Sequence, residues 1–209
     1  MFISGLIMVI VLVFSAILHE ISHGFVADRL GDPTARLMGR LTLNPKNHID
    51  PVMSILLPLL LILSGSPVIF GAAKPVPVDP FNLKDGRKDL AIVSLAGPLT
   101  NVIIAVVAAF IVKFSFVFGN FAPIVQPFFL IVVQINLLLA IFNLLPIPPL
   151  DGSKIFSLLL PEKEANTYMS LGSVGFMILF FLLMFPVAGF SLVEVIFSLL
   201  TFSEKLLGL

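Results

Sequence analysis

Long apolar stretches are the feature that most constrains the fold of this chain. A helix needs about 20 apolar residues to cross a bilayer, and five stretches reach or approach that length: 2–25, 89–112, 125–146, 170–186 and 188–207. A sixth stretch, 51–70, is interrupted by Pro58, Pro67 and the Ser-Gly-Ser sequence at 64–66. We therefore expect an all-α polytopic membrane protein with about five to six transmembrane helices.

Composition and charge narrow the class of protein further. Of the 209 residues, 58% are hydrophobic and 11% are charged, and the formal net charge is zero. Neither a basic tail nor a glycine-rich phosphate loop appears, so lipid and peptide are expected partners and nucleic acid is not. Because the chain has no cysteine, a metal site must use histidine and carboxylate ligands. No polar stretch reaches the roughly 50 residues of a soluble accessory module, so 1–209 is expected to form a single integral-membrane domain.

The basic residues predict how the chain is oriented in a cell membrane. They cluster at Arg29, Arg36, Arg40 and Lys46, at Lys84, Arg87 and Lys88, and at Lys154 and Lys163, with Lys205 near the end of the last stretch and Lys113 as the one outward basic residue. By the positive-inside rule these segments lie in the cytoplasm and the N-terminus lies outside. Residues 51–80 must then enter and leave the membrane on one side, as a small re-entrant β or loop segment. Two tightly paired short helices are the alternative.

The segment His19-Glu20-Ile21-Ser22-His23, at the end of the first apolar stretch, indicates metal chemistry. On a helix the two histidines lie one turn apart on one face, where both can bind a single ion with Glu20 beside it. Ionisable residues within an apolar span are costly and usually functional. An ion with three protein ligands keeps a position for water, and a neighbouring carboxylate can act as general base. The pattern predicts hydrolysis, with a structural or chance origin as the alternative.

Asp151 is the candidate third ligand. It follows a segment in which Pro146, Pro148 and Pro149 must end the incoming helix, and Gly152 allows the backbone to turn close to an ion. The alternative is an aspartate that caps the next helix at the membrane boundary.

Three segments together resemble the site-2 protease family of intramembrane zinc metalloproteases: HEISH at 19–23, SLAGPLTN at 94–101 and FNLLPIPPLDG at 142–152. Three more are similar to its compact prokaryotic branch, which has no PDZ or CBS domain: RLTLNP at 40–45, HIDP at 48–51 and GAAKPVPV at 71–78. The resemblance implies one Zn2+ per chain, bound by His19, His23 and Asp151, with Glu20 as the catalytic acid and base. It covers a catalytic core of about 5–160, whereas a C-terminal helical hairpin at about 168–207 matches by hydropathy alone.

Two further sets of residues are candidate substrate contacts. Asn101 lies one turn past Gly97, where a second helix could approach closely. The resemblance places Asn101 by the active site as a donor to the scissile carbonyl, and a hydrogen bond between helices is the alternative. The N–H groups of Lys74, Val76 and Val78 would line one edge of an extended segment and could pair with a substrate strand. A polyproline-like loop is the alternative.

Four polar residues in or near the apolar stretches have supporting roles in this interpretation. Asn143 is expected to support the metal ligands through hydrogen bonds, and Gln134 and Asn136 to do the same or to join helices. His48 is expected to be structural or to line a pocket, because a fourth protein ligand would close the position that water needs.

The sequence thus predicts an intramembrane zinc metalloprotease that hydrolyses single-span membrane proteins near the cytoplasmic side. The resemblance implies substrates such as anti-sigma factors, other membrane-anchored regulators or remnant signal peptides. A membrane metal transporter and a non-catalytic zinc-binding scaffold are the alternatives. Transport predicts several ligand sets along the bundle and does not need Glu20.

Overall fold

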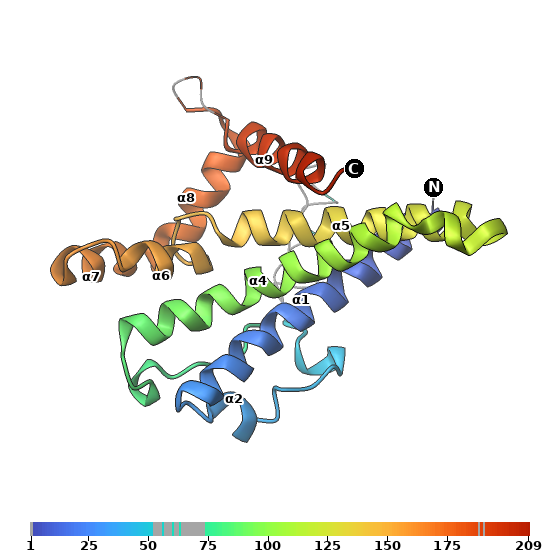
Figure 1. The fold of residues 1–209 in the computed structure, drawn as a ribbon. Coiled ribbons are helices and arrows are strands. Elements are labelled where there is room, and N and C mark those ends of the chain that lie inside the picture. Colours follow the sequence, from blue (N-terminus) through green and yellow to red (C-terminus); the bar gives the residue numbers. More distant parts are fainter. Residues whose placement is uncertain are drawn as a thin grey trace.

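The computed structural model describes residues 2–51, 74–187 and 191–209, together with positions 56, 60, 63 and 189. Its α-helices are α1 (Phe2–Leu30), α2 (Thr34–Leu37), α4 (Arg87–Lys113), α5 (Ala122–Asn143), α6 (Asp151–Ser157), α7 (Glu162–Ser170), α8 (Gly172–Met184) and α9 (Leu192–Leu206). Short 3-10 helices lie at η1 (Pro45–Asn47), η3 (Pro80–Asn82) and η4 (Ser115–Phe121). Figure 1 shows the three long helices α1, α4 and α5 packed along one another.

Three helical segments of the described residues are long and apolar enough to cross a bilayer: Gly5–Leu30, Arg87–Lys113 and Ser115–Asn143. Two more, Glu162–Ser170 and Val174–Met184, form a fourth candidate if the 71° bend between them lies within one span. The predicted helices at the C-terminal end are present as α8 and α9, but with 13 and 15 residues they are shorter than a full crossing. The all-helical, apolar architecture is confirmed, and the number of five to six crossings stays a prediction.

Most of the predicted re-entrant segment lies outside the described residues, which cover 52–73 only at positions 56, 60 and 63. Its last part, 74–79, is neither helix nor strand. This part lies against α1, because the side chain of Val76 occupies the space beside Gly24. The choice between a re-entrant loop and two short helices therefore stays a prediction.

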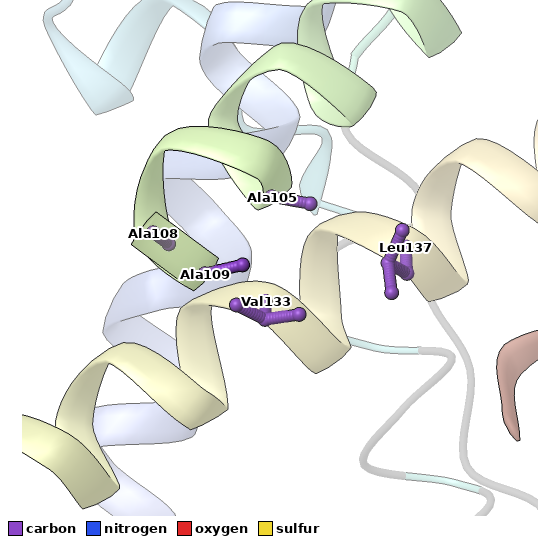
Figure 2. Close-up of a cluster of buried hydrophobic side chains, with 5 residues drawn as sticks. All are labelled: Ala105, Ala108, Ala109, Val133 and Leu137. Atoms are coloured by element: carbon purple, nitrogen blue, oxygen red, sulfur yellow. The ribbon is translucent and has the colours of Figure 1, made fainter. Parts of the chain in front are cut away.

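Helix α4 lies between α1 and α5 and brings their polar residues together. Its alanines 105, 108 and 109 pack on Val133 and Leu137 of α5, as Figure 2 shows. Small side chains allow two helices to approach closely where no hydrophobic effect drives them together. Large apolar side chains such as Leu6 and Phe14 of α1 and Phe110 of α4 are exposed instead. That distribution fits a bundle whose outer surface faces lipid.

Contacts from three sides hold α6 and the segment that leads into it. Arg87, at the start of α4, donates from Nη2 to the carbonyl oxygens of Ser157 and Leu160. The Tyr168 hydroxyl of α7 donates to Pro146 O at 2.8 Å. Apolar residues of α8 and α9 cover the same segment: Leu179, Leu192 and Ile196 cluster with Ile147 and Leu150. The C-terminal helices therefore fix the start of α6 against the long-helix bundle.

Candidate metal centre

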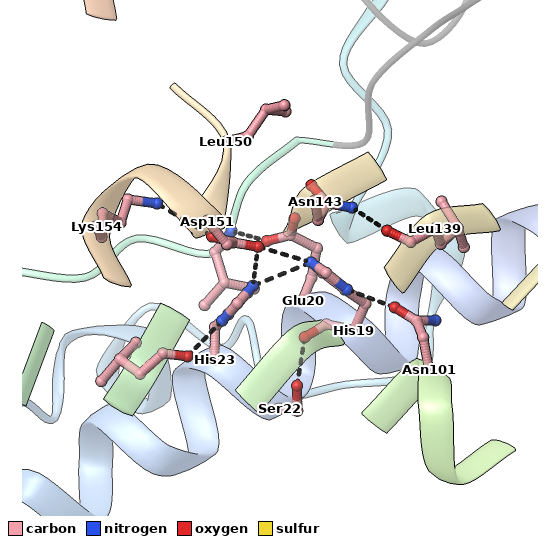
Figure 3. Close-up of polar contacts among 12 residues, drawn as sticks. His19, Glu20, Ser22, His23, Asn101, Leu139, Asn143, Leu150, Asp151 and Lys154 are labelled. Atoms are coloured by element: carbon pink, nitrogen blue, oxygen red, sulfur yellow. Dashed lines mark hydrogen bonds and ion pairs between the residues drawn. The ribbon is translucent and has the colours of Figure 1, made fainter. Parts of the chain in front are cut away.

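The two histidines of the predicted motif point to the same place. His19 and His23 lie one turn apart on α1, both are buried, and their Nε2 atoms are 3.1 Å apart. Figure 3 shows them facing α6, whose first residue is Asp151. Asp151 Oδ2 lies 3.2 Å from each Nε2 atom. The structure thus brings the three predicted ligands together, although 132 residues separate His19 from Asp151.

Gly152 explains how the proline segment can deliver Asp151 to this position. A Cβ atom on residue 152 would lie 2.2 Å from Leu144 O, far inside van der Waals contact. Any larger residue would push the start of α6 away from the end of α5. The turn predicted from the sequence is therefore present, and its tight contact is with the preceding helix end.

Hydrogen bonds at the Nδ1 atoms of the two histidines fix the tautomer of each ring, and so decide that Nε2 presents a lone pair to Asp151. His23 Nδ1 is 2.7 Å from Val93 O, a carbonyl that can only accept, so neutral His23 carries its proton on Nδ1. His19 Nδ1 donates in the same way to Asn101 Oδ1 at 2.6 Å. Both Nε2 atoms therefore present lone pairs to a carboxylate oxygen. Three acceptors this close repel one another unless a cation binds them.

The spacing of the three atoms fits zinc. Zinc bonds to nitrogen and oxygen ligands of about 2.0–2.1 Å place two ligands of a tetrahedron about 3.3–3.4 Å apart. The observed separations of 3.1, 3.2 and 3.2 Å fall a few tenths of an ångström below that edge. Among the described residues this is the one group of three histidine or carboxylate ligands within reach of a single ion. His19, His23 and Asp151 would hold such an ion with three ligands and would leave one position open for water or substrate.

A carboxyl that binds a metal ion must be ionised, and Lys154 favours the ionised form of Asp151. Burial raises the pKa of this carboxyl, and the positive charge of Lys154 beside it lowers the pKa. Lys154 Nζ lies 3.1 Å from Asp151 Oδ1, one turn along α6. Oδ1 thus has its own partner, and Oδ2 remains the oxygen that faces the histidines.

Gly97 lets α4 pass close to the two histidines. A Cβ atom on residue 97 would lie 2.5 Å from the Nε2 atoms of both His19 and His23. The close helix approach expected at this glycine is confirmed. Its function is more specific than helix packing, because the missing side chain leaves space for the ligand atoms themselves.

Glu20 lies beside the ligands and has a backbone partner. Its Oε2 accepts a hydrogen bond from Val76 N–H at 2.7 Å, and Figure 3 shows the carboxylate next to Asp151. The side chain is half-buried. A carboxylate in this position can exchange protons with a group at the fourth corner of the site.

Asn101 belongs to a buried polar chain that ends on His19. Its Nδ2 donates to Asn136 Oδ1 at 2.9 Å, and Asn136 Nδ2 donates to Ser15 Oγ at 2.9 Å. This chain joins α4, α5 and α1, and both asparagines are fully buried. Asn101 therefore orients a ligand, and the geometry gives no support to its predicted role as a donor to the scissile carbonyl.

The predicted substrate edge is largely occupied by the protein itself. Lys74 N–H donates to His48 O at 2.8 Å, and Val76 N–H donates to Glu20. In this structure neither N–H can pair with an incoming strand, so Val78 is the one of the three predicted donors that we retain. The sequence pattern showed which residues have N–H groups, but not which acceptors the fold places beside them.

Other predicted residues lie outside the ligand group. Asn143 Nδ2 donates to Leu139 O of its own helix at 2.9 Å, and its predicted support of the ligands stays a prediction. Asn136 reaches His19 through Asn101. Gln134 donates to Glu204 of α9 at 3.0 Å and joins two helices as predicted. His48 is buried, with Nε2 2.7 Å from Thr42 O, which agrees with a structural role.

Some contributors to the site carry little sequence signal. The Val93 carbonyl acts through its backbone, so no side-chain type marks it. Ser15 is an ordinary small residue of an apolar helix, and only its contact with Asn136 relates it to the site. Lys154 could have been noted from its position one turn after Asp151.

Comparisons with known proteins agree with this site. The model of Peptidase family M50 matches residues 7–127 and 117–185. The chain is 37% identical over 190 residues to YwhC of Bacillus subtilis, named as a candidate zinc metalloprotease, with 88% of this chain and 83% of that one covered. It is 35% identical over 169 residues to Rip2 of Mycobacterium tuberculosis, which carries the same description, with 81% and 62% covered. Rip2 of Mycolicibacterium smegmatis is 32% identical over 197 residues, with 90% and 71% covered.

No solved structure matches the chain. The family match covers both the histidine motif and Asp151, and the relatives are similar over most of this sequence. The chain therefore belongs to peptidase family M50, the site-2 protease family.

Proposed function

We propose that this protein is a zinc metalloprotease that hydrolyses peptide bonds of transmembrane substrates within the bilayer. The observation that carries the proposal is the convergence of three buried acceptor atoms, from His19, His23 and Asp151, with Glu20 beside them. The relatives YwhC and Rip2 are named as candidate zinc metalloproteases, which supports zinc as the metal.

The chain's own groups have distinct functions in the proposed reaction. His19, His23 and Asp151 would hold the zinc ion, which when bound polarises a carbonyl and lowers the pKa of water. Val76 holds Oε2 of Glu20, so we assign proton transfer to Oε1. That oxygen takes a proton from the attacking water and returns it to the leaving amine. Asn101 and the Val93 carbonyl keep the two imidazoles in the tautomer that the ligands require.

Single-span membrane proteins are the substrates that this setting favours. A transmembrane helix satisfies its own backbone hydrogen bonds, so its scissile carbonyl is shielded until the helix unwinds locally. Unwound peptide groups in hydrocarbon cost several kcal/mol each unless they find new partners. Val78 is the retained candidate for such a partner. In line with the family resemblance, we propose anti-sigma factors, other anchored regulators or remnant signal peptides as substrates.

The orientation is also part of the proposal. The basic residues between the apolar stretches place the N-terminus outside and the metal centre nearer the cytoplasm. Single-cysteine variants near Arg87 should then react with an impermeant thiol reagent only after the membrane is opened. Labelling of intact cells at that position would reverse the orientation.

The catalytic proposal is tested by Glu20→Gln. The amide keeps the shape of the side chain but cannot take up the proton, so we expect zinc to be retained and cleavage of a tagged single-span protein to be lost. Glu194→Gln, in the exposed first turn of α9, is the matched control and should cleave normally. Absence of cleavage by zinc-loaded wild type would favour a transporter or a zinc-binding scaffold, and equal cleavage by wild type and Glu20→Gln would refute the role of Glu20.

A further inference from the structure

Arg40 is a buried residue with no assigned role in the site. Only 7% of its surface is exposed. Nη2 donates to Lys74 O at 2.9 Å and to Pro75 O at 3.2 Å. Its backbone N–H donates to Ala35 O at 2.9 Å, which ties Arg40 to the end of α2. One side chain thus connects the segment after α1 with the segment at 74–76.

The segment held by Arg40 is the one that contacts Glu20. Pro75 and Pro77 have no N–H group, so Val76 has the one backbone donor in 75–77, and that donor bonds Glu20 Oε2. The fixed φ angles of the two prolines limit how far the Val76 peptide can turn. Lys74 N–H is fixed as well, by His48 O.

Packing on α1 brings Val76 within reach of Glu20. Gly24 lies one turn after Glu20, and a Cβ atom there would come within 2.8 Å of Val76 Cγ1 and 2.7 Å of Leu41 Cδ2. The missing side chain gives the loop room to lie directly on the helix. Packing alone, however, sets only how close Val76 lies to α1. The direction of its N–H depends on the two peptide groups before it.

We propose that Arg40 is a positioning residue for the catalytic base. By binding the carbonyl oxygens of residues 74 and 75, its guanidinium sets the orientation of the Val76 N–H, which in turn holds Oε2 of Glu20 and leaves the other oxygen directed at the reacting water. Arginine suits this function because one Nη2 group carries two N–H donors held in the rigid guanidinium plane, and the side chain stays charged when buried. The inference rests on the proposed function of Glu20.

Arg40→Met and Arg40→Lys test the proposal in the purified full-length protein. Arg40→Met fills similar space without donors, and Arg40→Lys keeps the charge without the planar fork. We expect Arg40→Met to lower kcat about 10- to 100-fold, the range that a displacement of about 1 Å produces, with KM and zinc content unchanged. Arg40→Lys should recover part of the activity. Arg36→Met is the matched control, because Arg36 is an exposed residue that pairs with Asp28.

Hydrogen exchange at the Val76 amide gives a readout that needs no cleavage. Exchange should be at least tenfold faster in Arg40→Met and in Glu20→Ala than in wild type, and unchanged in Arg36→Met. If Arg40→Met does not fold, Arg40→Lys decides by the same measurement. Wild-type exchange and wild-type kcat in the folded Arg40 variants would overturn the proposal. If wild type cleaves nothing but Val76 exchange still depends on Arg40, the proposed function fails while the structural link holds.

Discussion

Replacement of Gly97 by alanine should damage the metal site more than its small size suggests. The added methyl carbon would lie 2.5 Å from Nε2 of both His19 and His23, whereas ordinary van der Waals contact begins at 3.4 Å. Either α4 or the two imidazoles must therefore move by about 0.9 Å. Zinc ligand distances tolerate deviations of only about 0.2 Å. Loss of a hydrogen-bond partner of a metal ligand lowers metal affinity about 10- to 100-fold. We expect Gly97→Ala to lower zinc affinity by at least as much.

A competition titration with a chromophoric zinc chelator measures this loss directly in detergent. Gly5→Ala is the matched control, because a Cβ atom there meets nothing within 4 Å. Both substitutions improve intrinsic helix propensity by about 1 kcal/mol, so a difference between them reports the contact with the ligands. Wild-type zinc affinity in Gly97→Ala would refute the argument that the missing side chain makes space for the ligand atoms.

Two further predictions concern polar residues around the site. Asn136→Leu should weaken zinc binding about tenfold, because Asn101 loses the partner that holds it on His19. Asn143→Leu, which removes only a bond within α5, should not; equal losses in the same titration would contradict this assignment. Burial raises the pKa of Asp32, but hydrogen bonds from Thr34, Asn82 and Asp79 outweigh burial and lower it below 3.8. The stabilisation is thus present above pH 3.8 and lost as pH falls below it. The melting temperature of Asp32→Asn should therefore be lower than that of wild type at pH 7, and the gap should narrow towards pH 3; a gap independent of pH would count against it.

The ligand group could be predicted because its sequence signals are local. Two histidines four residues apart need only a helix to share a face, and the prolines before Asp151 force a helix end wherever that segment lies. The same local reasoning identified Gly97 as a point of close approach. These features depend on neighbours in the chain, so the sequence alone contains them.

The features that were not predicted depend on long-range placement. The N–H groups of Lys74 and Val76 looked available because their acceptors, His48 O and Glu20, come from other segments. Asn143 and Asn136 are chemically alike, and only the approach of Asn101 distinguishes them. Hydropathy located α8 and α9 but not their short lengths, since it measures apolar content rather than the point at which a helix ends.

The long separation of the ligands in the chain has a consequence during biosynthesis. A ribosome that adds about 5–20 residues per second needs roughly 7 to 26 s to progress from His19 to Asp151. Throughout that interval the nascent chain carries only two of its three ligands, and the C-terminal helices that fix α6 are made later still. The three-ligand site therefore cannot be complete before Asp151 has been made, and its packing against α8 and α9 must follow later.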